Sequence, residues 1–457
     1  MDAQLDQALY AKRQKIYPRQ VHGLFARMRL TGVVVLMGIY YLTPWFTWND
    51  RQAILWDLVA RKFHIFGVTF WPQDFIYLSA LLIIAALSLF FFTALAGRLW
   101  CGYACPQTVW TEVFLWIERK VEGDRSRQVK LAKGPWNFQK ISKRTIKHSI
   151  WIGLSIWTGY TFVGYFTPIR ELGHAVATFS TGPWQTFWIF FYGFATYGNA
   201  GWLREQVCIY MCPYARFQSA MFDRNTMIIS YDKARGEPRG SRRKKDPGAL
   251  GLGDCIDCTI CVQVCPTGID IRDGLQYECI GCASCIDACD DVMEKVGSPK
   301  GLIRYTTENV LLGKTTKILR PRIVVYGLIL LSLLLIVGYR ISQRIPLDLD
   351  VIRDRNTLYR EVDEGWIENV YTLKILNKDQ KDHYYRLSTS SEIPMTLKVD
   401  TDEIFVVAGE IGELIVRAQM DSKSLQNQSM EFEFEIASID TRNLVATEKA
   451  RFVGPIP

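Results

Sequence analysis

Two runs of cysteines carry the clearest chemistry in the chain. In each run three cysteines are separated by two residues, and a fourth follows after three more: Cys255, Cys258, Cys261 and Cys265, then Cys279, Cys282, Cys285 and Cys289. Thiolates in this spacing hold the two [4Fe-4S] clusters of bacterial ferredoxins, and the fourth cysteine of each run binds the other cluster. The spacing therefore predicts one cluster on Cys255, Cys258, Cys261 and Cys289, and a second on Cys279, Cys282, Cys285 and Cys265.

Zinc is the competing interpretation of these runs, because pairs of Cys-x2-Cys motifs also build four-cysteine zinc sites. Two complete runs in succession are much less expected for zinc, so we favour the clusters. Pro266 follows the first run, whereas Asp290 follows the second, and this difference concerns the local turn more than the ligands. Two clusters so close in the sequence indicate electron transfer, and a purely structural role is the alternative.

The other four cysteines form two Cys-x-x-x-Cys-Pro motifs, Cys101/Cys105 and Cys208/Cys212. Proline is common at the first helical position, so we expect Cys105 and Cys212 at helix N-caps, where the helix dipole would lower a thiol pKa. If the two motifs face each other, four soft sulfur ligands converge and suit Cu(I), zinc or an iron–sulfur centre. The alternative is that they are ordinary buried thiols.

A membrane scaffold is expected to position these cysteines. Apolar runs long enough to cross a bilayer core occupy residues 30–48, 75–95, 150–166, 184–203 and 323–339. Aromatic residues such as Trp45, Trp184 and Trp202 stand at their ends, as expected at the headgroup level. A buried core helix would explain one such run but hardly five. The segment before the first run is long and polar, which is unlike a cleaved signal peptide.

Lysine and arginine indicate the orientation of the spans. The segments 1–29, 98–147 and 204–322 are rich in these residues, and the segments between them are poor. Because basic loops stay on the cytoplasmic side, we expect a cytoplasmic N-terminus and, after five spans, an external C-terminus. Membrane topology thereby explains the net charge of +8, and we expect no nucleic-acid partner.

An internal repeat organises the membrane part. Trp100–Pro106 and Val207–Pro213 share one pattern, and each follows the second span of a helical hairpin. The two hairpins therefore form parallel repeats, which would bring both Cys-x-x-x-Cys-Pro motifs to the same membrane face. The expected organisation is a cytoplasmic segment 1–29, a transmembrane region 30–222, a basic linker 223–254 containing Arg242-Arg-Lys-Lys245, a two-cluster ferredoxin domain 255–310, the fifth span and an outer domain 341–457.

The outer domain has a different composition from the rest of the chain. Residues 341–457 contain no cysteine, and their 14 Lys and Arg against 21 Asp and Glu give a net charge of −7. Residues 370–376, 413–417 and 431–436 alternate polar and apolar side chains, which indicates half-buried strands. Short strands over such a length favour a small β-sandwich. The expected fold class is a multidomain membrane protein with a five-helix bundle, a bacterial two-[4Fe-4S] ferredoxin-like cytoplasmic domain and a C-terminal sandwich.

The whole chain resembles a family of cytochrome c oxidase accessory proteins known as CcoG, FixG or RdxA. The resemblance rests on both Cys-x-x-x-Cys-Pro motifs, on both ferredoxin runs, and on the segments Tyr231–Arg239, Cys285–Met293 and Gly301–Tyr305. Similarity to wider membrane polyferredoxins such as NapH and NosR is looser, because it does not cover the outer domain.

The resemblance implies a five-span inner-membrane protein with two [4Fe-4S] clusters and an immunoglobulin-like periplasmic C-terminal domain. It also implies an oxidoreductase, a cupric reductase that converts Cu(II) to Cu(I) during assembly of the cbb3-type cytochrome oxidase. By motif match, copper would interact with Cys101, Cys105, Cys208 and Cys212. The expected partners are membrane lipid, a cytoplasmic electron donor, the copper ion, and periplasmic oxidase assembly factors or copper chaperones.

Two other functions stay open. The first is a quinol-linked electron conduit to a periplasmic acceptor, which needs a quinone pocket that no sequence motif reveals. The second is a non-enzymatic scaffold for oxidase assembly, in which the clusters only hold the cytoplasmic loop together.

Overall fold

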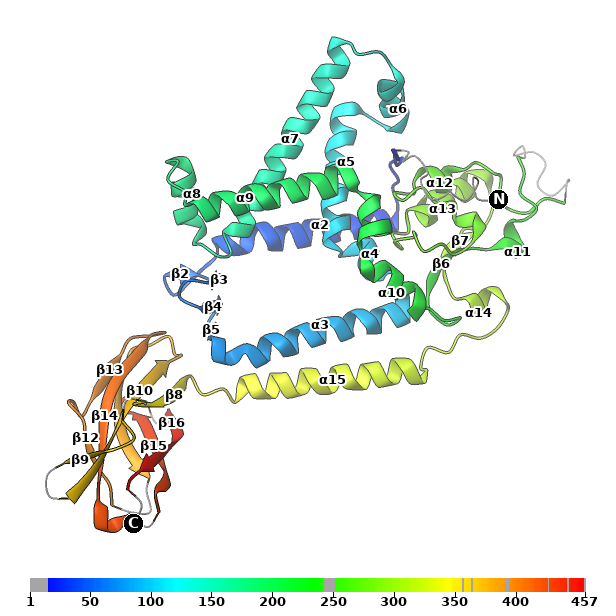
Figure 1. The fold of residues 1–457 in the computed structure, drawn as a ribbon. Helices are drawn as coiled ribbons and strands as arrows, with labels where there is room; N and C mark the ends of the chain where they lie inside the picture. The colour runs from blue at the N-terminus through cyan, green and yellow to red at the C-terminus, as the bar shows by residue number, and fades with distance from the viewer. Residues whose placement is uncertain are drawn as a thin grey trace, which may run out of the picture. The chain divides into compact units, whose positions relative to one another are not determined.

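The computed structural model describes residues 15–241, 251–355, 357–362, 365–390, 394–425, 427–441 and 444–455. The basic run Arg242-Arg-Lys-Lys245 of the expected linker lies outside these residues. The chain divides into two compact units. A helical unit comprises Met1–Leu55 and Tyr77–Leu334, and a β-rich unit comprises Trp56–Ile76 and Leu335–Pro457 (Figure 1).

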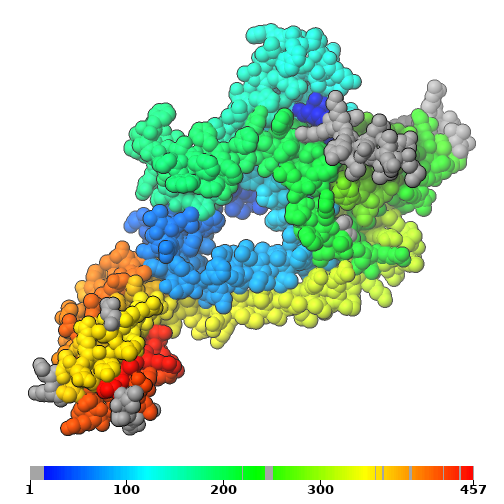
Figure 2. All heavy atoms as spheres, viewed as in Figure 1, coloured from blue at the N-terminus to red at the C-terminus, as the bar shows by residue number. Residues whose placement is uncertain are grey.

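Long apolar helices dominate the helical unit. Three helices in the described part of the chain are long and apolar enough to cross a membrane, over Leu24–Trp45, Pro72–Ala96 and Pro321–Ser342. They contain α2 (Leu24–Leu42), α3 (Phe75–Ala96) and α15 (Pro321–Ser342). A Cβ added to Gly327 of α15 would lie 3.4 Å from the Phe91 ring of α3, and the two helices form adjoining blue and yellow bands in Figure 2.

The other two expected spans coincide with helices that are less uniformly apolar. They are α7 (Phe138–Val163) and α9 (Pro183–Thr196), which the π-helical turn η3 (Tyr197–Leu203) continues. Basic residues crowd the first half of α7. Neither α7 nor α9 is among the helices that are long and apolar enough to cross a membrane. The five-span bundle therefore stays a prediction.

Small residues allow α7 and α9 to approach closely. A Cβ on Gly159 of α7 would lie 2.1 Å from the Ile189 carbonyl oxygen of α9, and a Cβ on Gly193 would lie 3.3 Å from the Ser155 carbonyl oxygen. Such backbone contacts through small residues are typical of helix pairs in membranes.

Short elements follow the long helices at each Cys-x-x-x-Cys-Pro motif. After α3 come α4 (Leu99–Tyr103) and α5 (Pro106–Glu122). After η3 come the π-helical turn η4 (Val207–Met211) and α10 (Pro213–Met221). In both copies a proline opens the second helix, because its fixed φ and missing N–H suit that position.

The ferredoxin-like module is built on a small two-stranded sheet. Strand β6 (Ile228–Tyr231) pairs antiparallel with β7 (Ile303–Thr306), and between them lie α12 (Ile260–Gln263), η5 (Ile271–Asp273) and α13 (Ser284–Val296). Apolar side chains of both strands and α13 form its core, including Ile229, Ile286, Met293 and Leu302. Residues before the expected start at 255 thus take part in the module, because β7 needs β6 as its partner. The helix α14 (Glu308–Leu311) follows.

The β-rich unit is a sandwich of two antiparallel sheets. One sheet has the order β12-β14-β10-β8, with β9 also paired to β10, and the other has the order β13-β11-β15-β16. Their bounds are β8 Leu347–Arg353, β9 Arg360–Val362, β10 Trp366–Asn377, β11 His383–Ser390, β12 Thr396–Lys398, β13 Ile404–Val406, β14 Ile411–Asp421, β15 Ser429–Ser438 and β16 Val445–Val453.

Strand alternation builds the core of the sandwich. In β15 the side chains of Phe432, Phe434 and Ile436 are buried, whereas the glutamates between them are not. The three segments in which the sequence predicts strands lie in β10, β14 and β15. Each sheet therefore hides one face, as a period of two requires.

The segment between α2 and α3 contains short strands. These are β1 (Thr47–Trp48), β2 (Arg51–Gln52), β3 (Ile54–Asp57), β4 (Lys62–Ile65) and β5 (Val68–Phe70). Within the β-rich unit, Asp74 forms ion pairs with Arg344 and with Lys378, the latter at 3.7 Å. The end of this segment is therefore joined to the residues that follow α15.

Candidate iron–sulfur and four-cysteine sites

The two cysteine runs turn in the same way around their central cysteines. Asp257 (φ 52°) and Thr259 (φ 56°) flank Cys258, and Gly281 (φ 69°) and Ala283 (φ 57°) occupy the equivalent positions around Cys282. A left-handed conformation costs a non-glycine residue roughly 1–2 kcal/mol. The surrounding structure must impose it, and both loops consequently curl around a central point.

A small cavity lies at the centre of each loop. The first is lined by Cys255, Cys258, Cys261 and Cys289, together with apolar side chains of α13 and β7. The second is lined by Cys265, Cys279, Cys282 and Cys285, together with Cys261. These are the two crossed ligand sets that the spacing predicts, and the apolar walls and sulfur donors fit [4Fe-4S] clusters.

Burial dominates the acidity of these thiols. Burial, with a smaller contribution from neighbouring thiolates, raises the pKa of Cys289 to about 12. Burial also raises the pKa of Cys279 to about 12, although the backbone N–H of Gly281 opposes the shift. Burial, with a smaller contribution from thiolates at Cys282 and Cys279, raises the pKa of Cys285 well above its usual value. Because ligation needs thiolates, metal loading must release protons here.

Side chains from other elements fasten the cluster loops. The Asp287 carboxylate in α13 accepts hydrogen bonds from the first amides of α2, Phe25 at 3.2 Å and Ala26 at 2.7 Å. Arg29 of α2 donates to the Cys282 carbonyl oxygen. The Arg98 guanidinium donates to the carbonyl oxygen of Cys279 at 3.1 Å. The loop of the second predicted cluster is thus tied to α2 through Arg29 and to the N-cap of α4 through Arg98.

Cys105 and Cys212 occupy N-cap positions, as their prolines predict. At Cys105 the expected depression of the thiol pKa is wrong, however, because burial outweighs the helix terminus. Burial raises the pKa of Cys105, although the backbone amides of Gln107 and Thr108 favour its thiolate. Burial also raises the pKa of both Cys101 and Cys208 to about 12.

The structure brings the two motifs together. Besides burial, thiolates at Cys105 and Cys208 raise the pKa of Cys101, and a thiolate at Cys212 raises the pKa of Cys105 and Cys208. Four thiols from distant segments are therefore within electrostatic reach of one another. In the described part of the chain, no three His, Cys, Asp or Glu side chains are gathered closely enough to hold a single metal ion.

A contact between glycines joins the four-cysteine site to the second cluster loop. A Cβ added to Gly102 would lie 2.7 Å from the Gly281 carbonyl oxygen and 3.1 Å from the Cys282 Cα. The backbone of α4 therefore packs directly on the loop between Cys279 and Cys282. Sequence reasoning missed this contact, although the two glycines that permit it stand next to cysteines, Gly102 after Cys101 and Gly281 before Cys282.

A buried charge cluster holds the second motif against α5 and α7. Glu118 pairs with Arg204 at 2.6 Å, Lys15 at 2.7 Å and Lys147 at 3.3 Å, and Lys147 also pairs with Glu122 at 2.7 Å. Burial alone would raise the pKa of Glu118, but the surrounding cations lower it to about 2. Glu118, Glu122, Lys147 and Arg204 are all at least nine-tenths buried, so their charges stabilise one another.

Comparison with known proteins identifies the parts of the chain. Residues 203–308 match a family described as a 4Fe-4S dicluster domain, and residues 78–122 match a 4Fe-4S binding domain. Residues 337–455 match the IG-like fold at the C-terminal of FixG. Fold and site together define an iron–sulfur membrane protein of the ferredoxin type.

Whole-chain relatives give the family. Protein RdxA of Cereibacter sphaeroides is 42% identical over 398 residues, which cover 84% of each chain. Nitrogen fixation protein FixG of Rhizobium meliloti is 40% identical over 86% of this chain and 82% of that protein. The chain belongs to the FixG/RdxA family. The ferredoxin-type protein NapH of Haemophilus influenzae is 25% identical over 47% of this chain and 67% of that protein.

One solved structure covers part of the chain. The crystal structure of a FixG-related protein from Vibrio parahaemolyticus is 27% identical to this chain, with a TM-score of 0.22. The match covers 24% of this chain and 98% of that one.

Proposed function

We propose that this electron-transfer protein reduces Cu(II) to Cu(I). Its eight ferredoxin cysteines would hold two [4Fe-4S] clusters, and Cys101, Cys105, Cys208 and Cys212 would bind the copper substrate. When bound, the clusters supply one-electron carriers, which match the one-electron change of copper. The observation that supports the proposal is the packing of Gly102, the neighbour of Cys101, on Gly281 and Cys282 of a predicted cluster loop.

The chemistry of the four thiols favours cuprous copper. Soft sulfur ligands stabilise Cu(I) over Cu(II), so thiolate binding would help to drive the reduction. Since burial raises the pKa of Cys101 and Cys208 to about 12, copper must displace protons from these thiols. Among the described residues, no three of these thiols surround a single ion position. Copper binding would therefore have to draw the thiols closer together.

The proposed topology follows from charge and chain order. The basic ferredoxin segment would face the cytoplasm, where thiols stay reduced. Since α15 alone separates that segment from the sandwich, the sandwich would lie in the periplasm. Its net charge of −7 over residues 341–457 would suit docking to oxidase assembly factors or copper chaperones, in keeping with a role in assembling a cbb3-type oxidase.

Single-turnover reduction tests this function. The full-length protein is purified anaerobically, its clusters are reduced with dithionite, excess reductant is removed, and Cu(II) is added. Cu(I) is followed with a cuprous chelator, and cluster oxidation is followed by EPR. We expect Cys101→Ser and Cys208→Ser to keep their iron and sulfide but to lose at least about tenfold in rate, since soft ligation is removed. Unchanged rates in Ser variants of all four cysteines would remove these cysteines from the reaction.

The assembly-scaffold alternative makes a different prediction in the same experiment. If the clusters serve only to hold the cytoplasmic module together, the reduced wild-type protein will not transfer electrons to copper at all.

A further inference from the structure

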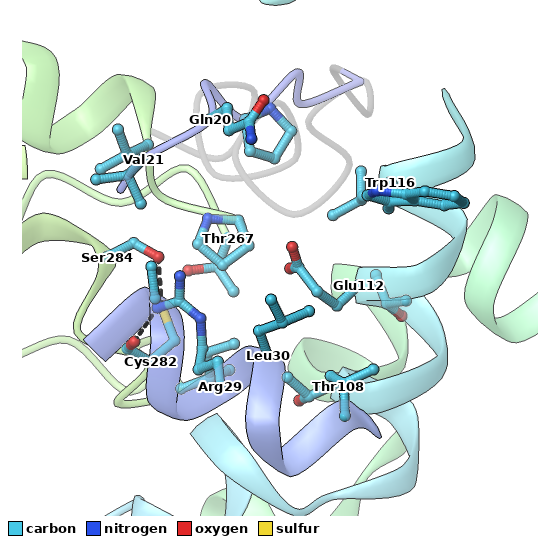
Figure 3. Close-up of a pocket in the computed structure, with 18 of the residues that line it drawn as sticks. Gln20, Val21, Arg29, Leu30, Thr108, Glu112, Trp116, Thr267, Cys282 and Ser284 are labelled. Carbon is cyan, nitrogen blue, oxygen red and sulfur yellow. Dashed lines mark hydrogen bonds between the residues drawn. The ribbon is translucent and has the colours of Figure 1, made fainter. Parts of the chain in front are cut away.

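The helical unit contains a cavity of about 750 Å³ at the beginning of α2 (Figure 3). Its walls come from the segment before α2, from the first turns of α2, from α5, and from the loops of the ferredoxin module. Figure 3 shows Leu30 of α2, Glu112 and Trp116 of α5, and Cys282 around the same space. The volume falls in the range of pockets that bind small organic ligands.

Both predicted redox sites contribute to the wall of this cavity. Cys282 belongs to the predicted second cluster, and Cys208 belongs to the four-cysteine site. Pro266 and Thr267, which follow the ligand Cys265, also line it. A molecule in this cavity would therefore contact residues of both sites, which points to a ligand that itself carries electrons.

The rest of the lining indicates an apolar ligand with hydrogen-bond acceptors. Leu30, Val33, Val113, Leu115 and Ile280 supply apolar surface. Leu30 and Val33 belong to a helix that is apolar enough to cross a membrane, and Leu30 is 60% exposed. The cavity thus lies at the first turns of a candidate membrane span.

Arg204 offers an unused donor in the same wall. Its side chain is only 4% exposed, and its Nη1 has no hydrogen-bond partner among the described residues. Its Nη2 donates to Glu118 at 2.6 Å and its Nε donates to the Gly201 carbonyl oxygen at 3.0 Å. The backbone of Arg204 is also held at φ 47°. Such strain is often found at ligand sites, and a buried unpaired donor favours a ligand with a carbonyl oxygen.

A phosphate-bearing cofactor is the competing occupant of this cavity. Besides Arg204, the lining includes Arg19, Arg27, Arg29, Arg119 and His22. Arg119 pairs with Glu112 at 2.9 Å, Arg27 donates to the Gly23 carbonyl oxygen, and Arg29 donates to the Cys282 carbonyl oxygen. The carboxylates of Glu112 and Glu205 also line the space. An uncharged ring with carbonyl groups meets both the apolar walls and the free Arg204 donor.

We propose that this cavity binds the head group of a membrane quinone, and that quinol oxidised there supplies the electrons for copper reduction. The inference rests on the proposed function, and it replaces the expected cytoplasmic electron donor by a quinol from the membrane. The quinol loses two electrons and two protons and leaves as quinone. The two predicted clusters, when bound, would accept these electrons, one each, and the Glu112 carboxylate and water would accept one proton each.

Binding to the detergent-solubilised holoprotein tests the site directly. Decylubiquinone and FMN are titrated in parallel, and an azido-quinone is photocrosslinked and mapped by mass spectrometry. We expect decylubiquinone to bind, FMN not to bind, and the label to fall on peptides within 26–33 or 107–119. Binding of FMN alone, binding of neither compound, or labelling confined to other segments would overturn the proposal.

A matched pair of variants on α2 sharpens the test. Leu30→Trp fills the cavity, whereas Val34→Trp adds the same side chain to a residue of similar exposure, 63%, that does not line it. Leu30→Trp is expected to weaken decylubiquinone binding at least about tenfold, which is 1.4 kcal/mol, and Val34→Trp is expected to bind like the wild type. Equal affinity for decylubiquinone in the two variants would refute quinone binding in this cavity. If Leu30→Trp does not fold, the position of the photocrosslinked label in the wild type decides between the two outcomes.

Failure of this proposal and failure of the proposed function can be told apart. Dithionite reduces the clusters without any quinol, so the copper experiment on the wild type does not depend on the cavity. Copper reduction without quinone binding would leave the copper function standing, and quinone binding without copper reduction would leave the cavity standing.

Discussion

At the scale of single residues, Gly102 governs the contact between the four-cysteine site and the predicted second cluster. We expect Gly102→Ala to push α4 away from the loop, because the added Cβ would lie 2.7 Å from the Gly281 carbonyl oxygen. Small displacements at reacting groups cost rate steeply, so copper reduction should slow at least about tenfold while iron content is kept. Stopped-flow reduction of Cu(II) measures this.

Gly153→Ala is the matched control. Gly153 also lies in a helix, α7, and a Cβ there would meet nothing within 4 Å. If Gly102→Ala transferred electrons as fast as Gly153→Ala, the contact would have no role in the reaction.

Glu118 is the centre of the buried charge cluster. In Glu118→Gln the neighbouring Arg204, Lys147 and Lys15 keep their charges but lose the carboxylate that they share. Breaking a buried ion pair in this way costs about 3–5 kcal/mol. Urea unfolding in detergent, followed by tryptophan fluorescence, measures the free energy of unfolding. Glu308→Gln is the control, because the pair of Glu308 with Arg224 is more than half exposed and such pairs contribute about 0–1 kcal/mol.

The stabilisation from Glu118 should depend on pH in a defined direction. The cations lower its folded pKa from 4.5 to about 2, so the unfolded chain binds a proton at higher pH than the folded one. The contribution is complete above about pH 4.5 and is lost as the pH falls toward 2. The difference in unfolding free energy between wild type and Glu118→Gln should shrink over this window, and a constant difference would contradict the assignment.

At the scale of elements, Asp287 couples the ferredoxin-like module to the start of α2. Helix α2 has Gly23 at its N-cap, which offers no side-chain acceptor, so Asp287 of α13 accepts from the amides of Phe25 and Ala26 instead. We expect Asp287→Ala to cost about 1 kcal/mol, as loss of a cap does, and to speed hydrogen exchange of these two amides.

The control for that change lies one turn further along α13. Asp291 forms an exposed pair with Lys295, so Asp291→Ala should leave exchange in α2 unchanged. Equal exchange of Phe25 and Ala26 in both variants would show that the cap does not hold the module.

At the scale of the whole molecule, metal content decides the chemistry. Two [4Fe-4S] clusters require eight irons and eight sulfides per chain, and we expect this content after anaerobic purification. Removal of the iron should melt α12 and α13, because the left-handed residues around Cys258 and Cys282 are no longer held by ligation. Iron and sulfide analysis with circular dichroism tests both. Zinc in place of iron, or unchanged helix content after iron removal, would contradict the expectation.

The β-rich unit also constrains how the chain crosses the membrane. Asp74, which precedes α3, pairs with Arg344 and Lys378, which follow α15. If α3 and α15 both cross a membrane, this contact requires an even number of spans from the start of α3 to the end of α15. In that arrangement α7 and α9 either both cross the membrane or both stay on one side of it.

Much of this architecture could be predicted from local patterns. Cysteine spacing predicts both cluster loops and prolines predict the N-caps at Cys105 and Cys212, because each depends on residues only a few positions apart. The thiol acidity could not be predicted in this way, since burial by distant elements outweighs the local helix terminus. The roles of Arg98 and Asp287 were missed for the same reason: their partners, Cys279 and the start of α2, lie far away in the sequence.

The sequence by itself determined the iron–sulfur chemistry, the apolar helices and the alternating strands of the sandwich, because spacing and periodicity are local properties of the chain. Only the tertiary structure decided that the two Cys-x-x-x-Cys-Pro motifs come within electrostatic reach of each other, that Gly102 packs on the loop before Cys282, and that a cavity opens between Cys282 and Cys208. These features arise where segments about a hundred or more residues apart pack together, and such packing depends on the complementary shape of surfaces that no local pattern records.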